Sequence, residues 1–237
     1  MSPRDREQIL SSLELSLGFP LRDDAQVTPA AAPFQGRWLE GGESWELFQK
    51  EIQALSGRFH WAETLQEARS AIRTILAEHG VRRAIRWEHP LLETLGIDDL
   101  LQDAGVERVF ETAGERFPRQ CAQAELGITA ADALIVESGT VLVLAKVDQP
   151  RSVSLVPPIH LAVVTPGQRL GSVAELPPLM RQWREQAGGL PSAIHLITGP
   201  SRTADIELTM VLGAHGPKVL HVLAMDPACL PAPPKRL

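Results

Sequence analysis

Apolar residues recur at helical spacing in the first part of the chain. Residues 2–17 carry Ile and Leu on one face, with Ser and Pro at the start and Gly18 at the end, which predicts a short amphipathic helix. Residues 19–42 are rich in Pro, Ala and Gly without periodicity, which is typical of a linker. A second helix is predicted over residues 44–56, before Gly57. We therefore expect an N-terminal helical arm and linker over residues 1–57.

From residue 58 onward, short apolar runs alternate with helical patterns. The runs RFHWA, RAIRW and VERVF predict strands. One helical pattern opens at Thr64, where Glu67 completes a capping box, and ends at Gly80. A second helical pattern starts at Pro90 and continues to about Gly105. Strand and helix alternating at this spacing are typical of right-handed βαβ units and a parallel sheet.

The second half of the chain is denser in strands. Five apolar runs, DALIV, VLVLA, HLAVV, AIHLIT and KVLHVLA, surround one helical pattern near residues 178–186. We expect an α/β domain over residues 58–226, with a mainly parallel sheet, helices on both faces and partly antiparallel pairing at the end of the sheet. Residues 227–237 are expected to form a Pro-rich C-terminal tail.

Charge and hydropathy narrow the classes of partner. The chain has 23 Lys and Arg against 29 Asp and Glu, a net charge of −6, so it lacks a general electrostatic attraction to nucleic acid. No apolar run approaches the ~18 residues of a membrane-spanning helix. The N-terminal residues mix charges into their apolar pattern, unlike a signal peptide. We expect a cytoplasmic protein without a nucleic acid partner or membrane insertion.

Residues that hold redox cofactors and metals are scarce. Cys121 and Cys229 stand far apart in the sequence, whereas an iron–sulfur cluster typically needs four thiolates. Neither the Rossmann glycine fingerprint nor a P-loop occurs. The histidines near the C-terminus match no close metal-ligand spacing. We therefore predict no cofactor and no metal.

One candidate site follows an apolar run in the segment DALIVESGTVLVLA. Glu137, Ser138, Gly139 and Thr140 separate two predicted strands, which places a titratable acid, two hydroxyls and backbone N–H groups at one strand end. Ligands bind at such strand ends in open α/β sheets. The alternative is a tight hairpin turn, in which Gly139 supplies a positive φ and the hydroxyls satisfy the turn.

A second candidate site follows a predicted strand in the segment ITGPSRTADIELT. Residues 199–205 combine small residues, hydroxyls and the cation Arg202 at a predicted strand-to-helix junction. Backbone N–H groups, the helix dipole and the guanidinium would all favour a phosphate or carboxylate there. The alternative is a capped helix N-terminus, in which Arg202 pairs with a nearby acid.

Three segments together resemble a known family. GITAADALIVESGTVLVL, PPIHLAVV and ITGPSRTADIELTMVLGAHGPKVLHVLAMD are similar to the lactate utilization protein C family, also called the LUD domain family, and the match covers about residues 58–226. The resemblance implies a fold like that of the sugar-phosphate isomerases and coenzyme A transferases. It also implies a role in oxidising L-lactate to pyruvate alongside two partner proteins, one of which carries iron–sulfur clusters. Glu137 takes the place of the acid in the family's ETGT-like turn, with Ser138 replacing the commoner Thr.

Two hypotheses remain open. In the first, the chain is a non-redox accessory component that binds a small anionic ligand or docks the cluster-bearing partner. In the second, it is a stand-alone isomerase or acyl-coenzyme A transferase-like enzyme, with Glu137 as nucleophile or general base and Arg202 on the anion of the substrate. The first is favoured because no fingerprint of a redox cofactor occurs, and because the sequence shows no second copy of the sheet pattern to complete a typical two-domain transferase. The candidate ligand-binding residues are Ser138, Gly139, Thr140, His160, Gly199, Pro200, Ser201, Arg202, Thr203 and Asp205.

Overall fold

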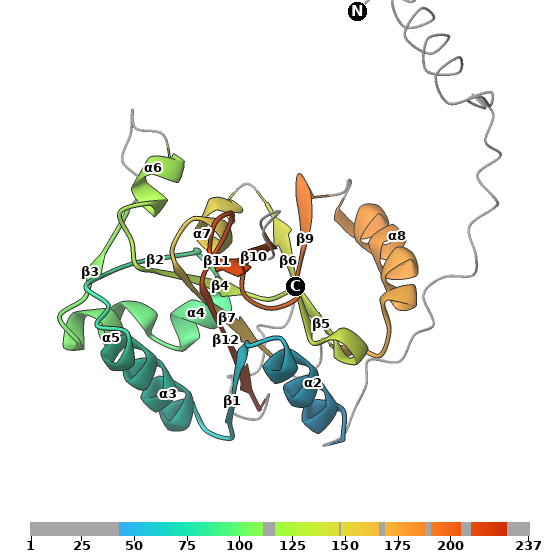
Figure 1. Ribbon diagram of the computed structural model, residues 1–237, viewed down its shortest axis with the longest axis horizontal. Helices are drawn as coiled ribbons and strands as arrows, with labels where there is room; N and C mark the ends of the chain where they lie inside the picture. Colours follow the sequence, from blue (N-terminus) through green and yellow to red (C-terminus); the bar gives the residue numbers. More distant parts are fainter. Residues whose placement is uncertain are drawn as a thin grey trace, which may run out of the picture. The chain divides into compact units, whose positions relative to one another are not determined.

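The computed structural model describes residues 43–110, 117–146, 148–165, 169–187, 191–204 and 210–226. The predicted helix over residues 2–17, the linker over residues 19–42 and the tail over residues 227–237 lie outside this part of the chain. The described elements form an α/β domain with a mainly parallel central sheet (Figure 1). The predicted fold class is therefore confirmed.

The central sheet has six strands, which all run parallel. They are β1 (Arg58–Ala62), β2 (Arg83–Arg86), β3 (Glu107–Arg108), β4 (Leu126–Ala130), β7 (Ile159–Val164) and β12 (Val219–Met225). Their order across the sheet is β1-β12-β7-β4-β2-β3. The runs RFHWA, RAIRW and VERVF therefore form strands as predicted.

Helices accompany this sheet on both faces, as the full burial of β4 and β7 requires. The described helices of the whole domain are α2 (Glu43–Ala54), α3 (Leu65–Glu78), α4 (Pro90–Thr94), α5 (Ile97–Asp103), α6 (Phe117–Cys121), α7 (Ser152–Leu155) and α8 (Leu176–Ala187), with 3-10 turns η1 (Val136–Ser138) and η2 (Val173–Glu175).

The strand register shows which helix covers which face. Gly127 of β4 pairs with His160 of β7 and faces α7, because a Cβ atom on Gly127 would lie 1.9 Å from a backbone oxygen of α7. Side chains alternate between faces along a strand, so Leu161 faces the other side, where it pairs with His221. His221 contacts His79, which caps the end of α3. The helices α3 and α7 thus lie on opposite faces of the sheet.

Local signals set the ends of two predicted helices. Thr64 Oγ1 accepts a hydrogen bond from the N–H group of Glu67 at 3.1 Å, so the Thr64 half of the predicted capping box is present. The Glu67 carboxylate accepts from the N–H group of Glu63 instead of that of Thr64. The helix predicted from Pro90 to about Gly105 is instead divided into α4 and α5. Gly96 adopts φ +62° between them, and this left-handed conformation interrupts the helix.

Helix α2, which the sequence analysis placed with the arm, packs into the core of the domain. Phe48 and Ile52 are fully buried and belong to the same apolar cluster as the central strands. Trp45 stacks on Phe59 of β1 with 5.7 Å between ring centroids. The N-terminal part of α2 is thereby fixed against the start of β1.

Four further strands form a second sheet instead of extending the first one. They are β5 (Ala133–Ile135), β6 (Thr140–Ala145), β8 (Arg169–Leu170) and β9 (Ala193–Ile197), in the order β8-β5-β6-β9. β6 pairs antiparallel with both β5 and β9. The predicted antiparallel pairing is present, but its place at the end of the central sheet is wrong. The reason is that η1 turns the chain back directly after β5, so β6 pairs with β5 and β9 instead of a central strand.

Helix α8 packs on one face of this second sheet (Figure 1). Leu142 and Leu144 of β6 form a small apolar cluster with Leu176, against which the partly buried Met180 and Trp183 pack. The helix predicted near residues 178–186 is therefore confirmed as α8. None of the described helices is long and apolar enough to cross a membrane.

Candidate functional site

The segment from Glu137 to Thr140 is the turn of a hairpin. Ile135 of β5 pairs with Thr140 of β6, and Gly139 between them has φ +59°. A Cβ atom on Gly139 would lie 2.5 Å from the backbone nitrogen of Ile52, so the turn rests directly on α2. The hairpin that the sequence analysis kept as the alternative is therefore the observed geometry.

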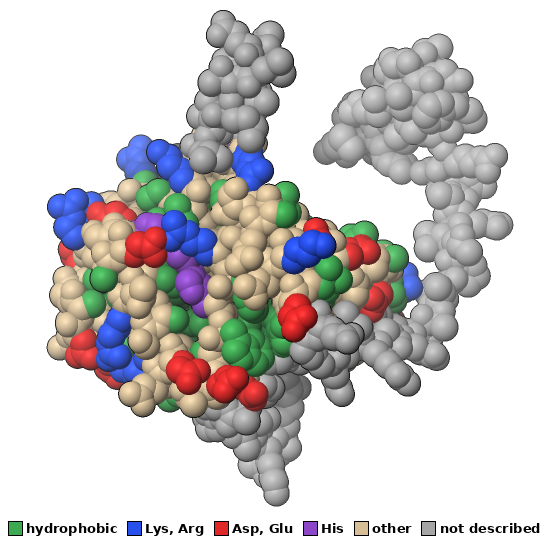
Figure 2. All heavy atoms as spheres, turned by 60° about the horizontal axis from the view of Figure 1, so that its bottom comes forward, with side chains coloured by type: hydrophobic (Ala, Val, Ile, Leu, Met, Phe, Trp, Pro, Cys, Tyr) green, Lys and Arg blue, Asp and Glu red, His purple; other side chains and the backbone are tan. Residues whose placement is uncertain are grey.

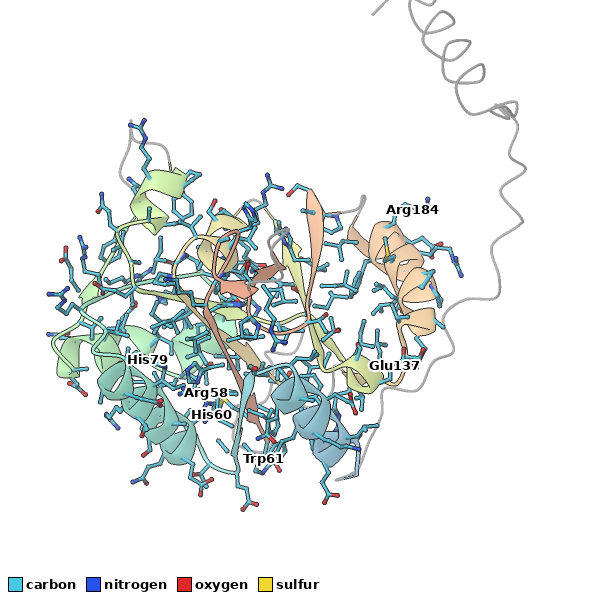
Figure 3. All side chains as sticks on the ribbon, in the orientation of Figure 1. Arg58, His60, Trp61, His79, Glu137 and Arg184 are labelled. Carbon is cyan, nitrogen blue, oxygen red and sulfur yellow. The ribbon has the colours of Figure 1, made fainter. Side chains whose placement is uncertain are left out.

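Glu137 directs its carboxylate to the neighbouring turn η2. Its Oε1 atom accepts hydrogen bonds from Ser172 Oγ and from the N–H group of Val173, both at 2.8 Å. The bond from Val173, followed by that from Ser172, lowers the pKa of Glu137 below its ordinary value. Figure 3 shows Glu137 at η1, on the side of α8. An exposed carboxylate held in its ionised form is a weak base, and it stabilises the start of η2.

A row of hydroxyls joins the two segments that the sequence analysis singled out. Ser138 Oγ lies 2.7 Å from Thr140 Oγ1, which lies 2.8 Å from Thr198 Oγ1. Thr198 follows β9, which pairs with β6, and directly precedes Gly199. The two segments are therefore side by side. Thr198 was not among the candidate residues, because only the pairing of β6 with β9 brings it to Thr140.

The segment after Thr198 leads into a hairpin and not into a helix. β10 (Arg202–Ala204) pairs antiparallel with β11 (Met210–Leu212). The N–H group of Ser201 donates to the Pro217 carbonyl oxygen at 2.9 Å and fixes the segment to the start of β12. The predicted strand-to-helix junction is wrong for these residues, because β10 finds a partner strand. Asp205 and the side chain of Thr203 lie outside the described residues.

Arg202 contacts the C-terminal end of α2. Its Nη2 atom donates to the carbonyl oxygen of Leu55 and to Ser56 Oγ, the latter at 2.9 Å. Gly199, at φ +97°, also approaches Leu55, whose carbonyl oxygen would lie 2.9 Å from an added Cβ atom. The carbonyl end of a helix carries partial negative charge and attracts a cation. Arg202 thus stabilises the end of α2, and its role toward a bound anion stays a prediction.

His160 lies inside the central sheet. Its side chain is fully buried, and its Nε2 atom lies 2.9 Å from Thr129 Oγ1. Burial lowers the pKa of His160 to about 3, so the ring is neutral at physiological pH. A ligand at the surface does not reach this ring in the observed conformation, and its predicted ligand-binding role is untested.

Three histidines that the sequence analysis did not combine form a chain of imidazole rings. His221 Nδ1 lies 2.8 Å from His60 Nε2, and His221 Nε2 lies 3.0 Å from His79 Nε2. Burial lowers the pKa of His221 to about 3. Figure 3 shows His60 and His79 near Arg58, which pairs with Glu78, and Figure 2 shows histidine side chains at the surface beside charged ones. No group of His, Cys, Asp or Glu among the described residues has the arrangement of a metal site.

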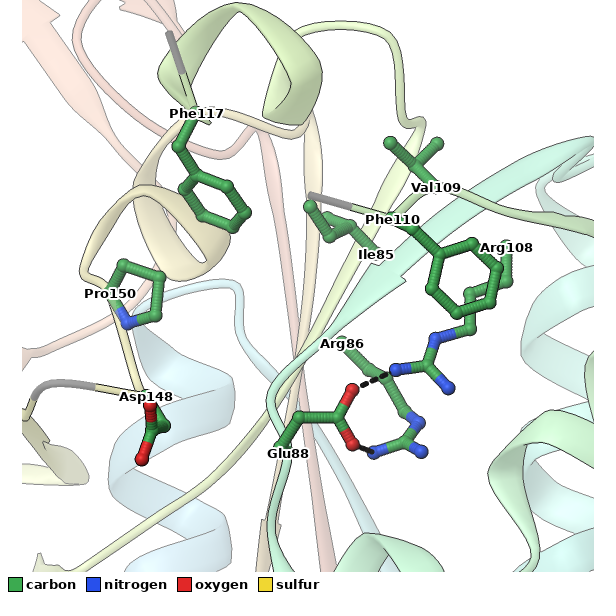
Figure 4. A pocket seen from close by; sticks show the side chains of 9 residues that line it. All are labelled: Ile85, Arg86, Glu88, Arg108, Val109, Phe110, Phe117, Asp148 and Pro150. Atoms are coloured by element: carbon green, nitrogen blue, oxygen red, sulfur yellow. Dashed lines mark hydrogen bonds and ion pairs between the residues drawn. The ribbon is translucent and has the colours of Figure 1, made fainter. Parts of the chain in front are cut away.

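A pocket of about 160 Å³ opens at the carboxyl ends of β2 and β3 (Figure 4). Arg86, Glu88 and Arg108 line one side of it, and Phe117 and Pro150 line the other. No sequence motif marks this site, because its charged residues come from separate strands. Pairing of β2 with β3 is what brings the two arginines together.

Two carboxylates bridge the two arginines of this pocket. Arg86 donates from Nε and Nη2 to Asp98 of α5 at 2.8 and 2.7 Å, and from Nη1 to Glu88 at 3.0 Å. Arg108 donates to the same two carboxylates and lies over the Phe110 ring, 4.4 Å from its centroid. The hydrogen bond from Arg86 is the largest cause that lowers the pKa of Asp98. The four charges cancel and tie the ends of β2 and β3 to α5.

The fold and the sites together define an α/β protein of a parallel central sheet and a second, largely antiparallel sheet. The chain belongs to the LUD domain family, whose domain matches residues 45–225. The resemblance noted in the sequence is therefore confirmed.

Relatives support this assignment over most of the chain. Lactate utilization protein C of Halalkalibacterium halodurans is 37% identical over 147 residues, which are 62% of this chain and 64% of that protein. Lactate utilization protein C of Geobacillus sp. (strain WCH70) is 29% identical over 233 residues, which cover 94% of this chain and 96% of that protein. Similarity to proteins of this name supports a role in lactate utilization.

One solved structure supports the fold. The crystal structure of a DUF162 family protein from Deinococcus radiodurans superposes with a TM-score of 0.54 at 23% sequence identity. The similarity covers 79% of this chain and 99% of that one. The shared architecture therefore extends over most of the described domain.

Proposed function

We propose that this chain is a cytoplasmic, non-redox component of a system that oxidises L-lactate to pyruvate together with partner proteins, one of which carries iron–sulfur clusters. The observation that carries the proposal is the similarity to lactate utilization protein C along nearly the whole length of both proteins. Within that system, the chain binds a small anionic ligand, partner subunits, or both.

The cysteines of the chain favour a non-redox role. Cys121 is fully buried at the end of α6, and Cys229 is the only other cysteine in the sequence. A typical iron–sulfur cluster takes four cysteine thiolates. The electrons of lactate are therefore assigned to a partner, and this chain supplies binding and positioning.

The contacts of two candidate residues favour an accessory role over a stand-alone enzyme. Glu137 Oε1 is held by Ser172 and Val173, whereas Arg202 is held by Leu55 and Ser56. A nucleophile and an anion-binding group that act on one substrate need to face a common space. These two side chains are bonded to different elements, η2 and the end of α2.

Complementation tests the proposal in cells. A bacterium that has lost its own lactate utilization protein C receives this chain together with the partner proteins from the same source. We expect growth on L-lactate to return and growth on pyruvate to be independent of the chain. Equal growth on L-lactate with and without the chain would contradict the proposal.

Reconstitution tests the non-redox assignment. The purified chain alone should reduce no electron-accepting dye in the presence of L-lactate, whereas partners plus chain should reduce it faster than partners alone. The control is the same mixture with D-lactate. Lactate oxidation by the isolated chain, or an unchanged rate when it is added to the partners, would overturn the assignment.

A further inference from the structure

We propose that the pocket at the ends of β2 and β3 binds a small monocarboxylate, which takes the place of the Glu88 carboxylate on Arg86 and Arg108. This proposal deepens the proposed function, because it assigns the anionic ligand to a site that the sequence motifs did not indicate. Four features favour such a ligand: the position of the pocket, the exposure of the three charged side chains, the charge balance and the apolar wall.

The pocket shares strand β2 with a place at which α/β sheets bind ligands, although its other lining residues follow β3 or precede α7. After β2, the chain continues through α4 and α5 to β3 on one side, whereas after β4 it leads toward β7 on the other side. Strands β2 and β4 are neighbours in the sheet. Crevices form outside the carboxyl ends of parallel strands at such a divergence. The pocket begins at Ile85 and Arg86, the last residues of β2.

The exposure of the charged side chains shows which of them can leave. The side chain of Arg86 is 5% exposed and that of Arg108 is 14% exposed, whereas the Glu88 side chain is 57% exposed. Glu88 can therefore turn into water without uncovering the core, and a carboxylate regains its hydration there. Its carboxylate spans the two guanidinium groups in the position that a bound carboxylate would take.

The charge balance selects the class of ligand. Asp98 holds Arg86 by two hydrogen bonds and also accepts one from Arg108, so it remains when Glu88 leaves. Two arginines and Asp98 then carry one net positive charge at the arginine side of the pocket, while Asp148 on the facing wall is an exposed carboxylate that stays hydrated. One carboxylate neutralises this charge, whereas a dicarboxylate or a phosphate dianion would leave an uncompensated negative charge in a partly buried site.

The walls of the pocket limit the size and the polarity of the part of the ligand beyond its carboxylate. Ile85, Phe117 and Pro150 give it an apolar side, and the volume of about 160 Å³ admits only a short carbon chain. Asp148 also lines the pocket, and its exposed carboxylate can accept a hydrogen bond from a ligand hydroxyl. A short 2-hydroxy acid satisfies these features together. The choice of L-lactate among such acids rests on the proposed function, whereas the carboxylate class rests on the arginines.

Calorimetric titration of the full chain tests the site with three probes: L-lactate, propionate and lactamide. L-Lactate should bind saturably, propionate more weakly because it lacks the hydroxyl, and the uncharged lactamide at least tenfold more weakly than L-lactate. Lactamide binding as tightly as L-lactate would overturn the proposal. Binding of propionate without L-lactate would support the carboxylate site and count against lactate as its ligand.

Two substitutions at the pocket sharpen the test. Glu88→Gln removes the competing charge from an exposed side chain, so L-lactate should bind several-fold more tightly. Arg108→Gln should abolish measurable binding, with a thermal unfolding curve recorded to show that the variant is folded. Glu107→Gln, the control for Glu88→Gln, removes one negative charge outside the pocket. This variant should bind L-lactate as tightly as the unchanged chain does.

The outcomes separate this proposal from the proposed function. An unchanged or weaker affinity of Glu88→Gln would overturn the displacement of Glu88. Absence of binding by any carboxylate probe would overturn the site, while restored growth on L-lactate by the unchanged chain would still support the proposed function. Loss of that growth in a folded, non-binding Arg108→Gln chain would support both.

Discussion

The two arginine sites of this domain use the same side chain in different ways. Arg202 is exposed and neutralises the carbonyl end of a helix, so its partners are a backbone oxygen and a hydroxyl. Arg86 and Arg108 are mostly buried and share two carboxylates. Arg202 belongs to a segment that resembles a family motif, whereas Arg86 and Arg108 belong to no motif. A motif therefore helps to locate a residue in the fold, but the burial and the partners of an arginine determine the role of its charge.

The largest effect is expected where the β5–β6 hairpin touches α2, the helix whose C-terminal end Arg202 contacts. Gly139→Ala places a Cβ atom 2.5 Å from the backbone nitrogen of Ile52 at a positive φ. We expect the free energy of unfolding to fall by at least about 3 kcal/mol, because both backbone strain and a clash with a helix must be relieved. Urea unfolding measures it.

Gly105→Ala is the matched control for that substitution. Gly105 also has a positive φ, but no atom lies within 4 Å of an added Cβ. The free energy of unfolding should therefore fall only by the cost of the backbone strain, about 1–2 kcal/mol. Equal destabilisation by the two substitutions would show that the hairpin does not rest on α2.

The next effect concerns the buried arginine pair. Asp98→Ala leaves Arg86 without its two-pronged partner, so we expect a loss of about 2–3 kcal/mol in the free energy of unfolding. Asp99→Ala, at the next position in the first turn of α5, should cost only about 0.3–1 kcal/mol through the helix dipole. Thermal and urea unfolding of both variants measure the difference. A loss in Asp98→Ala no larger than that in Asp99→Ala would remove the contrast between the two arginine sites.

Arg202→Ala should have a smaller effect. Its hydrogen bonds to Leu55 and Ser56 are exposed to water, so the loss should be about 1 kcal/mol. Growth on L-lactate should then follow the amount of folded protein. The stability of Arg202→Lys should lie between that of Arg202→Ala and that of the unchanged chain. A stable Arg202→Ala chain that fails to restore growth would instead support the anion-binding role predicted from the sequence.

The smallest effect is a difference in salt dependence between two carboxylates. The hydrogen bond from the charged Arg86, followed by the charges of Arg86 and Arg108, lowers the pKa of Asp98, whereas the neutral N–H group of Val173 lowers that of Glu137. Salt screens charges, so 1 M NaCl should raise the pKa of Asp98 toward its ordinary value and leave that of Glu137 nearly unchanged. Carbon-detected NMR titration of the carboxyl groups follows both. Equal shifts would mean that the two lowered values share one cause.

Acid stability follows from the same difference. A carboxyl whose folded pKa is lowered stabilises the fold above its ordinary pKa, and this contribution is lost as the pH falls through the folded value. Asp98 therefore stabilises the fold at neutral pH and no longer does so in strong acid. Asp98→Asn should flatten this part of the stability curve, measured by urea unfolding between neutral pH and about pH 3.

Local features of the fold could be predicted from the sequence. The cap of α3 depends on Thr64 and Glu67 alone, three positions apart, and the sequence located it. Apolar runs likewise located most of the strands, because buried strands need apolar residues on both faces. The division at Gly96 was missed, because a single glycine inside a helical pattern is compatible with either outcome.

Features that depend on distant residues could not be predicted. Arg202 donates a hydrogen bond to Leu55, which is 147 positions away in the sequence, and no local sequence pattern predicts that contact. Arg86 and Arg108 become neighbours only through the pairing of β2 with β3. Only part of the hydroxyl row could be predicted. Ser138 and Thr140 are close in sequence, whereas Thr198 joins them only through the pairing of β6 with β9.

The place of β12 between β1 and β7 has a consequence for the order in which the domain can be completed during synthesis. Among the described residues, β1 pairs only with β12 in the central sheet, and β12 is the last strand. A nascent chain from which residues 219–225 have not emerged from the ribosome has β1 unpaired and one side of β7 open to other strands. The first described strand is thus joined to the sheet last, and a chain cut short before β12 loses the pairing of β1 as well as β12 itself.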